Sequence, residues 1–193
     1  MNNKDIEMNK IVRKEHFSEN VVKLEIEAQL IAKSRKAGHF VIVRVDEDGE
    51  RMPLIIADSD VARGTITLVV QKMGVSSTKL CNLNVGDEVL DLVGPLGKAT
   101  HIENFGTVVC AGGGVGVAPM LPIIKAMKEA GNRVVSILAG RTKDLIILEE
   151  QVREYSDEVV IMTDDGSYGN KGLITQGVEE VINREKVDMC VTI

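Results

Sequence analysis

The chain has 193 residues, of which 44% are hydrophobic and 27% are charged, and its formal net charge is -6. This composition supplies ordinary hydrophobic cores and argues against a disordered chain, while the length suits one large domain or two small ones. Lysine and arginine are spread along the chain without clusters, so the basic patch of a nucleic-acid-binding protein is missing.

The opening of the chain, residues 1–10, is polar and lacks the apolar core of a secretory signal. No later apolar run approaches the roughly 20 residues that cross a bilayer. We therefore expect a cytoplasmic protein with no membrane partner.

Short β-rich runs broken by turn residues follow, as far as residue 93. The first runs nearly alternate apolar and charged residues, which is typical of half-buried antiparallel strands. The expected strands are residues 10–15, 21–28, 39–45, 53–57, 64–71 and 88–93, with one short helix at 76–82. Six short strands at this spacing predict a small antiparallel β-barrel of the Greek-key type.

From residue 106 strands and helices alternate. We expect strands at 107–111, 133–139, 158–163 and 187–193, and helices at 118–130, 147–155 and 174–183. The strand runs are apolar throughout, as in parallel strands buried on both faces, so this half predicts a doubly wound α/β domain. The predicted domains are residues 1–97 and 104–193, with the linker at 94–106.

The strongest single feature is a buried strand that runs into a glycine cluster and then a helix. The cluster comprises Gly113, Gly114, Val115, Gly116 and Val117. Glycines allow a diphosphate to approach the backbone, and the free N–H groups and dipole of a helix start favour its charge. The alternative is a glycine turn required for packing alone.

Two further groups of polar residues follow the next strands of the same domain. Asp164, Asp165 and Gly166 come after the third strand, and Arg141 and Lys143 come after the second. Ligands bind at the carboxyl ends of such strands, although an exposed acidic turn and solvated surface charges are the alternatives. These charges do not distinguish an NAD-binding site from an NADP-binding site.

In the barrel half, an arginine and a hydroxyl-rich helix start form a weaker pattern. Arg51 precedes one expected strand, while Gly74 precedes the short helix and Ser76 and Ser77 begin it. Such a set is a reasonable clamp for a second diphosphate. Two diphosphate sites on successive domains imply two dinucleotides.

Neither a catalytic side chain nor a metal site is expected. The three histidines are isolated, and Cys81, Cys110 and Cys190 are odd in number and far apart. This spacing suits neither a disulfide framework nor a zinc site, and the three thiols are expected to be small buried hydrophobes.

Six motifs occur in order between residues 51 and 172, and the resemblance they carry extends from about residue 9 to the last residue. They are Arg-x-Pro-Leu, Gly-x-Ser-Ser, Gly-Pro-Leu-Gly, Gly-Gly-Gly-Val-Gly, Gly-Arg-Thr-Lys-Asp and Thr-Asp-Asp-Gly-Ser-Tyr-Gly-x-Lys-Gly. With these motifs the chain resembles the ferredoxin-NADP reductase-like electron-transfer subunits. Within that group it is similar to the electron-transfer subunit of dihydroorotate dehydrogenase. It is more similar still to the small subunit of NADH-dependent ferredoxin:NADP oxidoreductase, also called the sulfide dehydrogenase β subunit.

The resemblance implies an FAD-binding barrel and an NAD(P)-binding α/β domain. It implies FAD at Pro53, Leu54, Ile55, Val70, Gln71, Lys72, Ser76 and Ser77, and NAD(P)H at residues 113–117, Arg141 and 164–166. Many relatives have serine or threonine where this chain has Ile55, so only the backbone can hydrogen-bond near the flavin there. Arg51 also lies one position earlier than in the broader reductase pattern.

The family continues into a cysteine-rich tail that binds a [2Fe-2S] cluster. Such a cluster needs four thiolates, and this sequence contains three cysteines. We therefore expect a C-terminally truncated chain, with the cluster only in a longer parent protein.

The resemblance implies an oxidoreductase subunit in which hydride passes from NAD(P)H to FAD. Electrons would then pass through an iron–sulfur centre to a larger flavin or iron–sulfur subunit, with ferredoxin or a similar protein as a possible acceptor. The alternatives are a stand-alone flavin reductase and a non-catalytic regulatory or assembly subunit.

Overall fold

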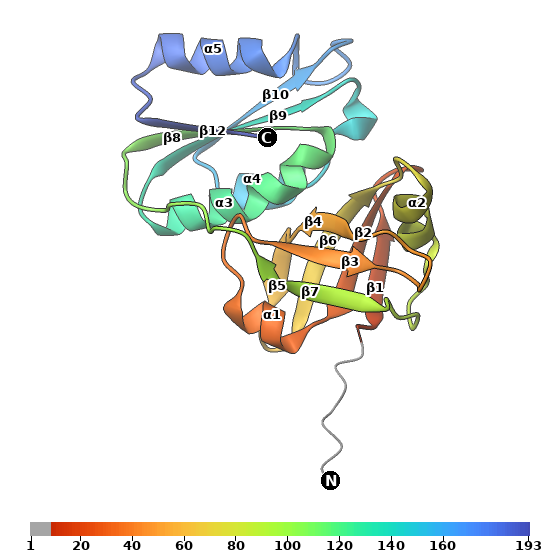
Figure 1. Ribbon diagram of the computed structural model, residues 1–193. Helices are drawn as coiled ribbons and strands as arrows, with labels where there is room; N and C mark the ends of the chain where they lie inside the picture. Colours follow the sequence, from red (N-terminus) through yellow and green to blue (C-terminus); the bar gives the residue numbers. More distant parts are fainter. Residues whose placement is uncertain (1–8) are drawn as a thin grey trace. The chain divides into compact units, whose positions relative to one another are not determined.

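The computed structural model describes residues 9–193, so most of the polar opening segment lies outside the described residues. The chain divides into two compact units, Met1–Ala99 and Thr100–Ile193 (Figure 1). No helix in the described range is long and apolar enough to cross a membrane.

The first unit consists mainly of antiparallel strands. Its elements are β1 (Ile11–His16), β2 (Val21–Glu27), α1 (Gln29–Ser34), β3 (Phe40–Arg44), β4 (Met52–Ile55), β5 (Asp58–Asp60), β6 (Thr65–Gln71), α2 (Val75–Asn82) and β7 (Asp91–Leu96). One sheet has the order β1-β2-β6-β5, and the other has the order β4-β3-β7.

Backbone hydrogen bonds join the two sheets into a barrel. The chain bends between β4 and β5, where Ile56 N donates to His39 O at 3.1 Å and Ala57 N donates to Thr67 O at 2.9 Å. On the opposite side, Ile11 N donates to Asp87 O at 2.9 Å, just before β7. The predicted antiparallel barrel is therefore confirmed.

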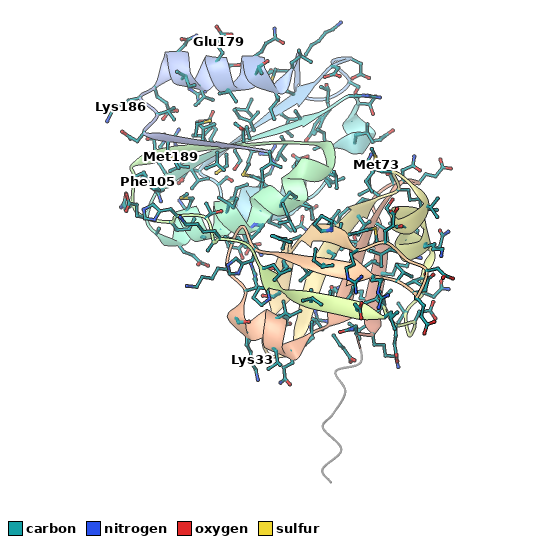
Figure 2. The ribbon with its side chains drawn as sticks, viewed as in Figure 1. Lys33, Met73, Phe105, Glu179, Lys186 and Met189 are labelled. Carbon is teal, nitrogen blue, oxygen red and sulfur yellow. The ribbon has the colours of Figure 1, made fainter. Side chains whose placement is uncertain are left out.

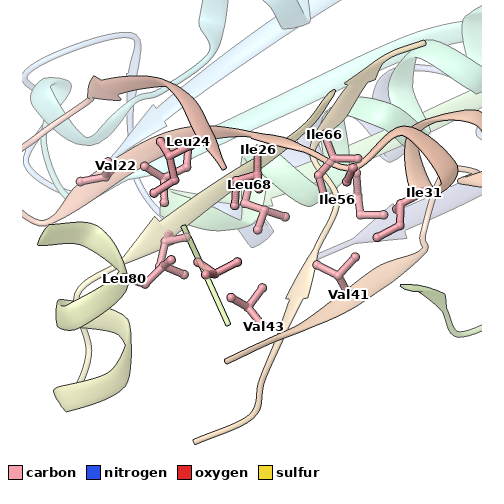
Figure 3. Packing of buried hydrophobic residues seen from close by; sticks show 14 of the residues in the cluster. Val22, Leu24, Ile26, Ile31, Val41, Val43, Ile56, Ile66, Leu68 and Leu80 are labelled. Atoms are coloured by element: carbon pink, nitrogen blue, oxygen red, sulfur yellow. The ribbon is translucent and has the colours of Figure 1, made fainter. Parts of the chain in front are cut away.

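Alternating side chains of the barrel strands fill one core (Figure 3). Leu24 and Ile26 of β2 face Ile66 and Leu68 of β6, and all four are fully buried. Burying each such side chain contributes about 1.5–3 kcal/mol. The core therefore holds both sheets in register and leaves the outward-facing residues available for a ligand.

The second unit is a parallel sheet with helices on both faces (Figure 1). Its elements are β8 (Thr107–Gly113), η1 (Gly114–Gly116), α3 (Val117–Glu129), β9 (Arg133–Gly140), η2 (Lys143–Leu145), α4 (Glu149–Glu154), β10 (Glu158–Thr163), β11 (Asn170–Lys171), α5 (Ile174–Arg184) and β12 (Met189–Thr192). The strand order is β11-β10-β9-β8-β12. Along the chain, the strands after β8 are first added on one side of it, and β12 is then added on its other side. This reversal at β8 is the predicted doubly wound arrangement.

Three features of the barrel differ from the sequence prediction. The strand expected at 88–93 is β7, Asp91–Leu96, so Gly94 and Pro95 lie in a strand and not in a linker. Because β7 pairs only with β3, it is an edge strand, where a proline without an N–H is tolerated. The helix α1 was not predicted, and Asp58–Asp60 forms β5 and not only a turn.

The ends of the α/β elements shift by a few residues. The fourth helix begins at Glu149 and not at residue 147, because Leu148 has a left-handed backbone with φ 58°. A left-handed residue cannot continue a right-handed helix.

Candidate functional site

The glycine turn between β8 and α3 combines packing glycines with an open backbone. A Cβ on Gly112 would lie 3.1 Å from Gly116 O and from Val117 Cα, so this glycine is required for packing. Gly114 has φ +53°, and a Cβ there would meet nothing within 4 Å. A ligand can therefore approach the backbone closely at Gly114. At Gly112, by contrast, packing alone explains the glycine.

The turn also presents unused hydrogen-bond donors. Within the described chain, the backbone N–H groups of Gly114 and Val115 have no acceptor, whereas Gly113 N donates to Ile193 O at 3.3 Å. Gly113 is exposed, and Gly114 and Val115 are half-buried. The short η1 turn leads directly into α3, so these donors precede a helix of 13 residues. Together they form an arrangement suited to an anion.

The loops after β9 and β10 are joined by hydrogen bonds. Asp164 N donates to Gly140 O at 3.1 Å, and Asp165 N donates to Arg141 O at 3.3 Å. Lys143 N donates to Ser167 Oγ at 2.9 Å. Arg141 and residues 164–166 are therefore brought together at the carboxyl ends of neighbouring strands.

This loop pair borders the glycine turn, because Gly113 on β8 is the register partner of Ala139 on β9. The Asp165 carboxylate accepts a hydrogen bond from Ser167 N at 2.9 Å, and the contacts with Ser167 lower the pKa of Asp165. The residues of the α/β unit that were predicted to bind a nucleotide thus lie together at the carboxyl ends of the strands of one sheet.

A side-chain network behind these loops was not predicted. Tyr168 Oη donates to Glu149 Oε1 at 2.9 Å, and Arg153 Nε donates to the same oxygen at 2.8 Å. Lys143 Nζ lies 5.4 Å from the centre of the Tyr168 ring. Tyr168 was part of a motif, but its partner is 19 positions earlier, at the start of α4, and no local pattern indicates that contact.

In the barrel unit, the start of α2 presents donors beside two hydroxyls. Ser77 Oγ accepts hydrogen bonds from Met73 N at 2.9 Å and from Gly74 N at 3.0 Å. The backbone N–H groups of Val75 and Ser76 have no acceptor in residues 9–193. Figure 2 labels Met73, whose exposed side chain immediately precedes this helix start.

The predicted flavin residues of β4 and β6 divide between the two faces of the barrel wall. Pro53, Ile55 and Gln71 are exposed, whereas Leu54 and Val70 pack into the barrel core. The two strands lie against each other. Only the backbone of Leu54 and of Val70 is therefore available to a ligand on the outer face.

Two charged residues near this wall contact other parts of the barrel, Lys72 through its backbone and Arg51 through its guanidinium. Lys72 N donates to Asn20 O at 2.8 Å. The Arg51 guanidinium lies 3.5 Å from the Asp91 carboxylate, which also accepts a hydrogen bond from Arg44 at 2.6 Å. Arg51 remains largely exposed and is not bonded to the start of α2.

The cysteines differ from the prediction at one position. Cys81 and Cys110 are buried as expected, and burial raises the pKa of Cys110 to about 12. Cys190, on the edge strand β12, is exposed and not buried. No group of histidine, cysteine and acidic residues in the described chain is arranged to hold a metal ion.

Comparisons with known proteins agree with this architecture. The chain is 42% identical over 183 residues to the dihydroorotate dehydrogenase B (NAD(+)) electron transfer subunit homolog of Thermotoga maritima, covering 95% of this chain and 64% of that protein. It is 31% identical over 181 residues to the corresponding electron transfer subunit of Streptococcus pneumoniae, covering 91% of this chain and 70% of that protein. No family model matches the chain.

A solved structure of an NADH-dependent reduced ferredoxin-NADP oxidoreductase, described in connection with flavin-based electron bifurcation, superposes with a TM-score of 0.90 at 39% identity. The match covers 96% of this chain and 67% of that one. The ferredoxin reductase of carbazole 1,9a-dioxygenase shares the fold, with a TM-score of 0.82 at 19% identity over 95% of this chain and 59% of that one.

The chain spans 64% and 62% of the lengths of two curated relatives that are more than 40% identical to it. Its two-unit architecture and its sequence nevertheless match the same group of proteins. The chain therefore belongs to the ferredoxin-NADP reductase-like electron transfer subunit family, which includes the electron transfer subunits of dihydroorotate dehydrogenase B.

Proposed function

We propose that this chain is the FAD- and NAD(P)H-binding part of an electron-transfer subunit. The observation that carries the proposal is the presence of one donor-rich helix start on each unit, Gly74–Ser77 before and within α2 and Gly113–Val117 before α3. Membership of an electron transfer subunit family supports two different dinucleotides, one at each start.

FAD fits the outer face of the barrel. The free N–H groups of Val75 and Ser76, with the Ser76 hydroxyl, suit its diphosphate. Exposed Pro53 and Ile55 offer an apolar surface to the flavin ring, with Gln71 as a polar neighbour and Lys72 at the end of β6. Ile55 carries no hydroxyl, so its backbone is left to hydrogen-bond the ring.

NAD(P)H fits the carboxyl ends of β8, β9 and β10. Gly114 and Val115 would donate to its diphosphate, and Arg141 with residues 164–166 would border its ribose or nicotinamide. When bound, NAD(P)H supplies a hydride and FAD accepts it, which lets the flavin release electrons singly. The side chains position the cofactors, and no general base is needed.

We further propose that electrons leave through an iron–sulfur centre toward a larger catalytic subunit, with ferredoxin as one possible acceptor. The names of the curated relatives as electron transfer subunits support such a partner. The cysteines of this chain do not fit a four-thiolate cluster, because the sequence contains three of them and Cys81 and Cys110 are buried. Any such cluster would need other ligands.

The experiment is an anaerobic titration of the FAD-loaded chain with NADH and, separately, with NADPH. We expect the flavin absorbance near 450 nm, a wavelength set by the cofactor, to bleach with one of them at stoichiometric concentration. A chain that binds FAD but stays oxidised with both would contradict hydride transfer. A chain that binds no FAD would contradict the cofactor assignment itself.

A further inference from the structure

The proposed FAD diphosphate site is in contact with a carboxylate of the chain itself. Ser76 Oγ donates to Glu50 Oε2 at 3.2 Å, and this contact joins the β3–β4 loop to the start of α2. Lys79 Nζ donates to Asp46 Oδ2 at 2.9 Å, which fixes the other end of the same loop to the same helix. The loop therefore rests on α2 through two polar contacts.

The loop is strongly acidic. Residues 46–50 read Asp-Glu-Asp-Gly-Glu, so four of the five carry a carboxyl group. The Asp46 carboxylate raises the pKa of Lys79, which shows that the loop and helix charges interact. Arg51, which follows directly, has its guanidinium 3.5 Å from Asp91, so the loop's nearest arginine is already paired with another carboxylate.

A carboxylate and a phosphate are recognised at a helix start by the same features. Both are stabilised by unused backbone N–H groups, by hydroxyl donors and by the positive end of the helix dipole. The Val75 and Ser76 N–H groups and the Ser76 hydroxyl are the donors available here. Glu50 already uses that hydroxyl.

We propose that Glu50 is an internal competitor of the FAD diphosphate and sets the affinity of the barrel for FAD. The inference rests on the proposed FAD site at α2. FAD binding exchanges the Glu50–Ser76 hydrogen bond for one between Ser76 and a phosphate, and it moves the Glu50 carboxylate away from the incoming negative charge. Glu50 is thus an affinity-determining residue and not a ligand of the cofactor.

The test compares FAD binding to apoprotein of the full chain and of two variants, Glu50→Gln and Glu47→Gln. Each variant removes one negative charge from the same loop, but Glu47 is exposed and makes no side-chain hydrogen bond within the described chain. The Kd for FAD is measured by quenching of flavin fluorescence at low and high NaCl concentration. Thermal melts establish that all three proteins fold equally well.

We expect Glu50→Gln to bind FAD about fivefold more tightly at low salt, because displacing a neutral amide from the Ser76 hydroxyl costs about 1 kcal/mol less than displacing a carboxylate. Glu47→Gln should change the Kd by less than about twofold, since Glu47, unlike Glu50, makes no hydrogen bond to Ser76 and its exposed charge is screened. The gain of Glu50→Gln should shrink at high salt.

An unchanged Kd in Glu50→Gln, or an equal gain in both variants, would overturn the proposal. Weaker binding in Glu50→Gln would also overturn it, because it would make the carboxylate a ligand of the cofactor. If the parent chain itself binds no FAD, the proposed FAD site fails, and that outcome is distinct from the three above.

Discussion

The two units present a helix start to an anion in different ways. At α2 the donors are accompanied by the hydroxyls of Ser76 and Ser77, and one hydroxyl already holds a carboxylate. At the turn before α3 the donors are backbone groups alone, and Gly114 has open space where a side chain would be. The diphosphate donors of the barrel site can therefore be weakened by removing a side chain, whereas access to the backbone donors of the glycine turn is blocked by adding one.

The largest effect is expected from adding a methyl group to the glycine turn. In Gly114→Ala the Cβ meets no protein atom, but it would occupy the space through which the diphosphate is proposed to approach. We expect the Kd for NAD(H) to rise at least about tenfold, or roughly 1.4 kcal/mol, while FAD binding is unchanged. Isothermal titration calorimetry with each nucleotide measures both.

The matched control is Gly86→Ala. Gly86 also has a left-handed backbone, with φ +98°, and a Cβ there also meets nothing within 4 Å. Both variants should lose about 1–2 kcal/mol of stability through backbone strain. Equal losses of NAD(H) affinity in the two variants would mean that strain, and not the lost approach to Gly114, is responsible.

A smaller effect is expected from removing a hydroxyl at the barrel site. Ser76→Ala should weaken FAD binding about fivefold, the value of about 1 kcal/mol for one hydrogen bond, with little change in Tm. Ser77→Ala should instead lower the stability by about 1 kcal/mol, because its hydroxyl caps two backbone N–H groups. The reverse pattern of effects would contradict these roles of the two hydroxyls.

Tyr168→Phe tests whether the network behind the nucleotide loops positions them. Loss of the hydrogen bond to Glu149 should cost about 0.5–1 kcal/mol and weaken NAD(H) binding about twofold. Glu149→Gln should have a similar effect, and the double variant should be little worse than either single one. Fully additive effects, measured by titration and thermal melts, would show that the two residues act separately.

The smallest effect is expected at the opposite end of the sheet, where ion pairs and not a ligand site connect the strands. Arg133 Nε donates to Glu185 Oε2 at 2.9 Å and, with Arg184, lowers the pKa of Glu185 from 4.5 to about 2. The stabilisation from this lowered pKa is therefore present above about pH 4.5 and is lost as the pH falls toward 2.

Glu185→Gln should accordingly lower the Tm slightly at pH 7, and its difference from the parent should disappear between pH 4.5 and about 2. Glu179→Gln is the control, because Glu179 is an exposed residue of α5 without an ion pair in the described residues. A difference from the parent that stays constant with pH would contradict the assigned ion pairs. NAD(H) binding should be unaffected by both variants.

Much of the fold could be predicted because strand and helix periodicity is local. The runs around Leu24 and Val135 show the alternation or continuous apolarity that their burial requires. The helix α1 and the strand β5 were missed because α1 follows directly after β2 and Asp58–Asp60 contains no apolar residue, so neither shows a period of its own. Their positions depend on tertiary contacts such as the hydrogen bond from Arg35 Nε to Ser59 Oγ at 2.7 Å.

The glycines of the candidate site could be predicted from the sequence, but the contacts between its side chains could not. The requirement for glycine at Gly114 follows from a motif that is contiguous in sequence. The pairing of Arg51 with Asp91 and of Glu50 with Ser76 joins residues 40 and 26 positions apart, and a single sequence contains no signal for either. The packing of Val70 into the core likewise follows from strand register.

The central claim is that each unit binds its own dinucleotide, and hydrogen–deuterium exchange with mass spectrometry tests it most directly. FAD alone should slow exchange at the start of α2 and leave the turn before α3 unchanged. NAD(H) alone should slow exchange at residues 113–117 and 164–166 and leave α2 unchanged. Protection of the same segment by both nucleotides, or of neither segment by its assigned nucleotide, would contradict the account.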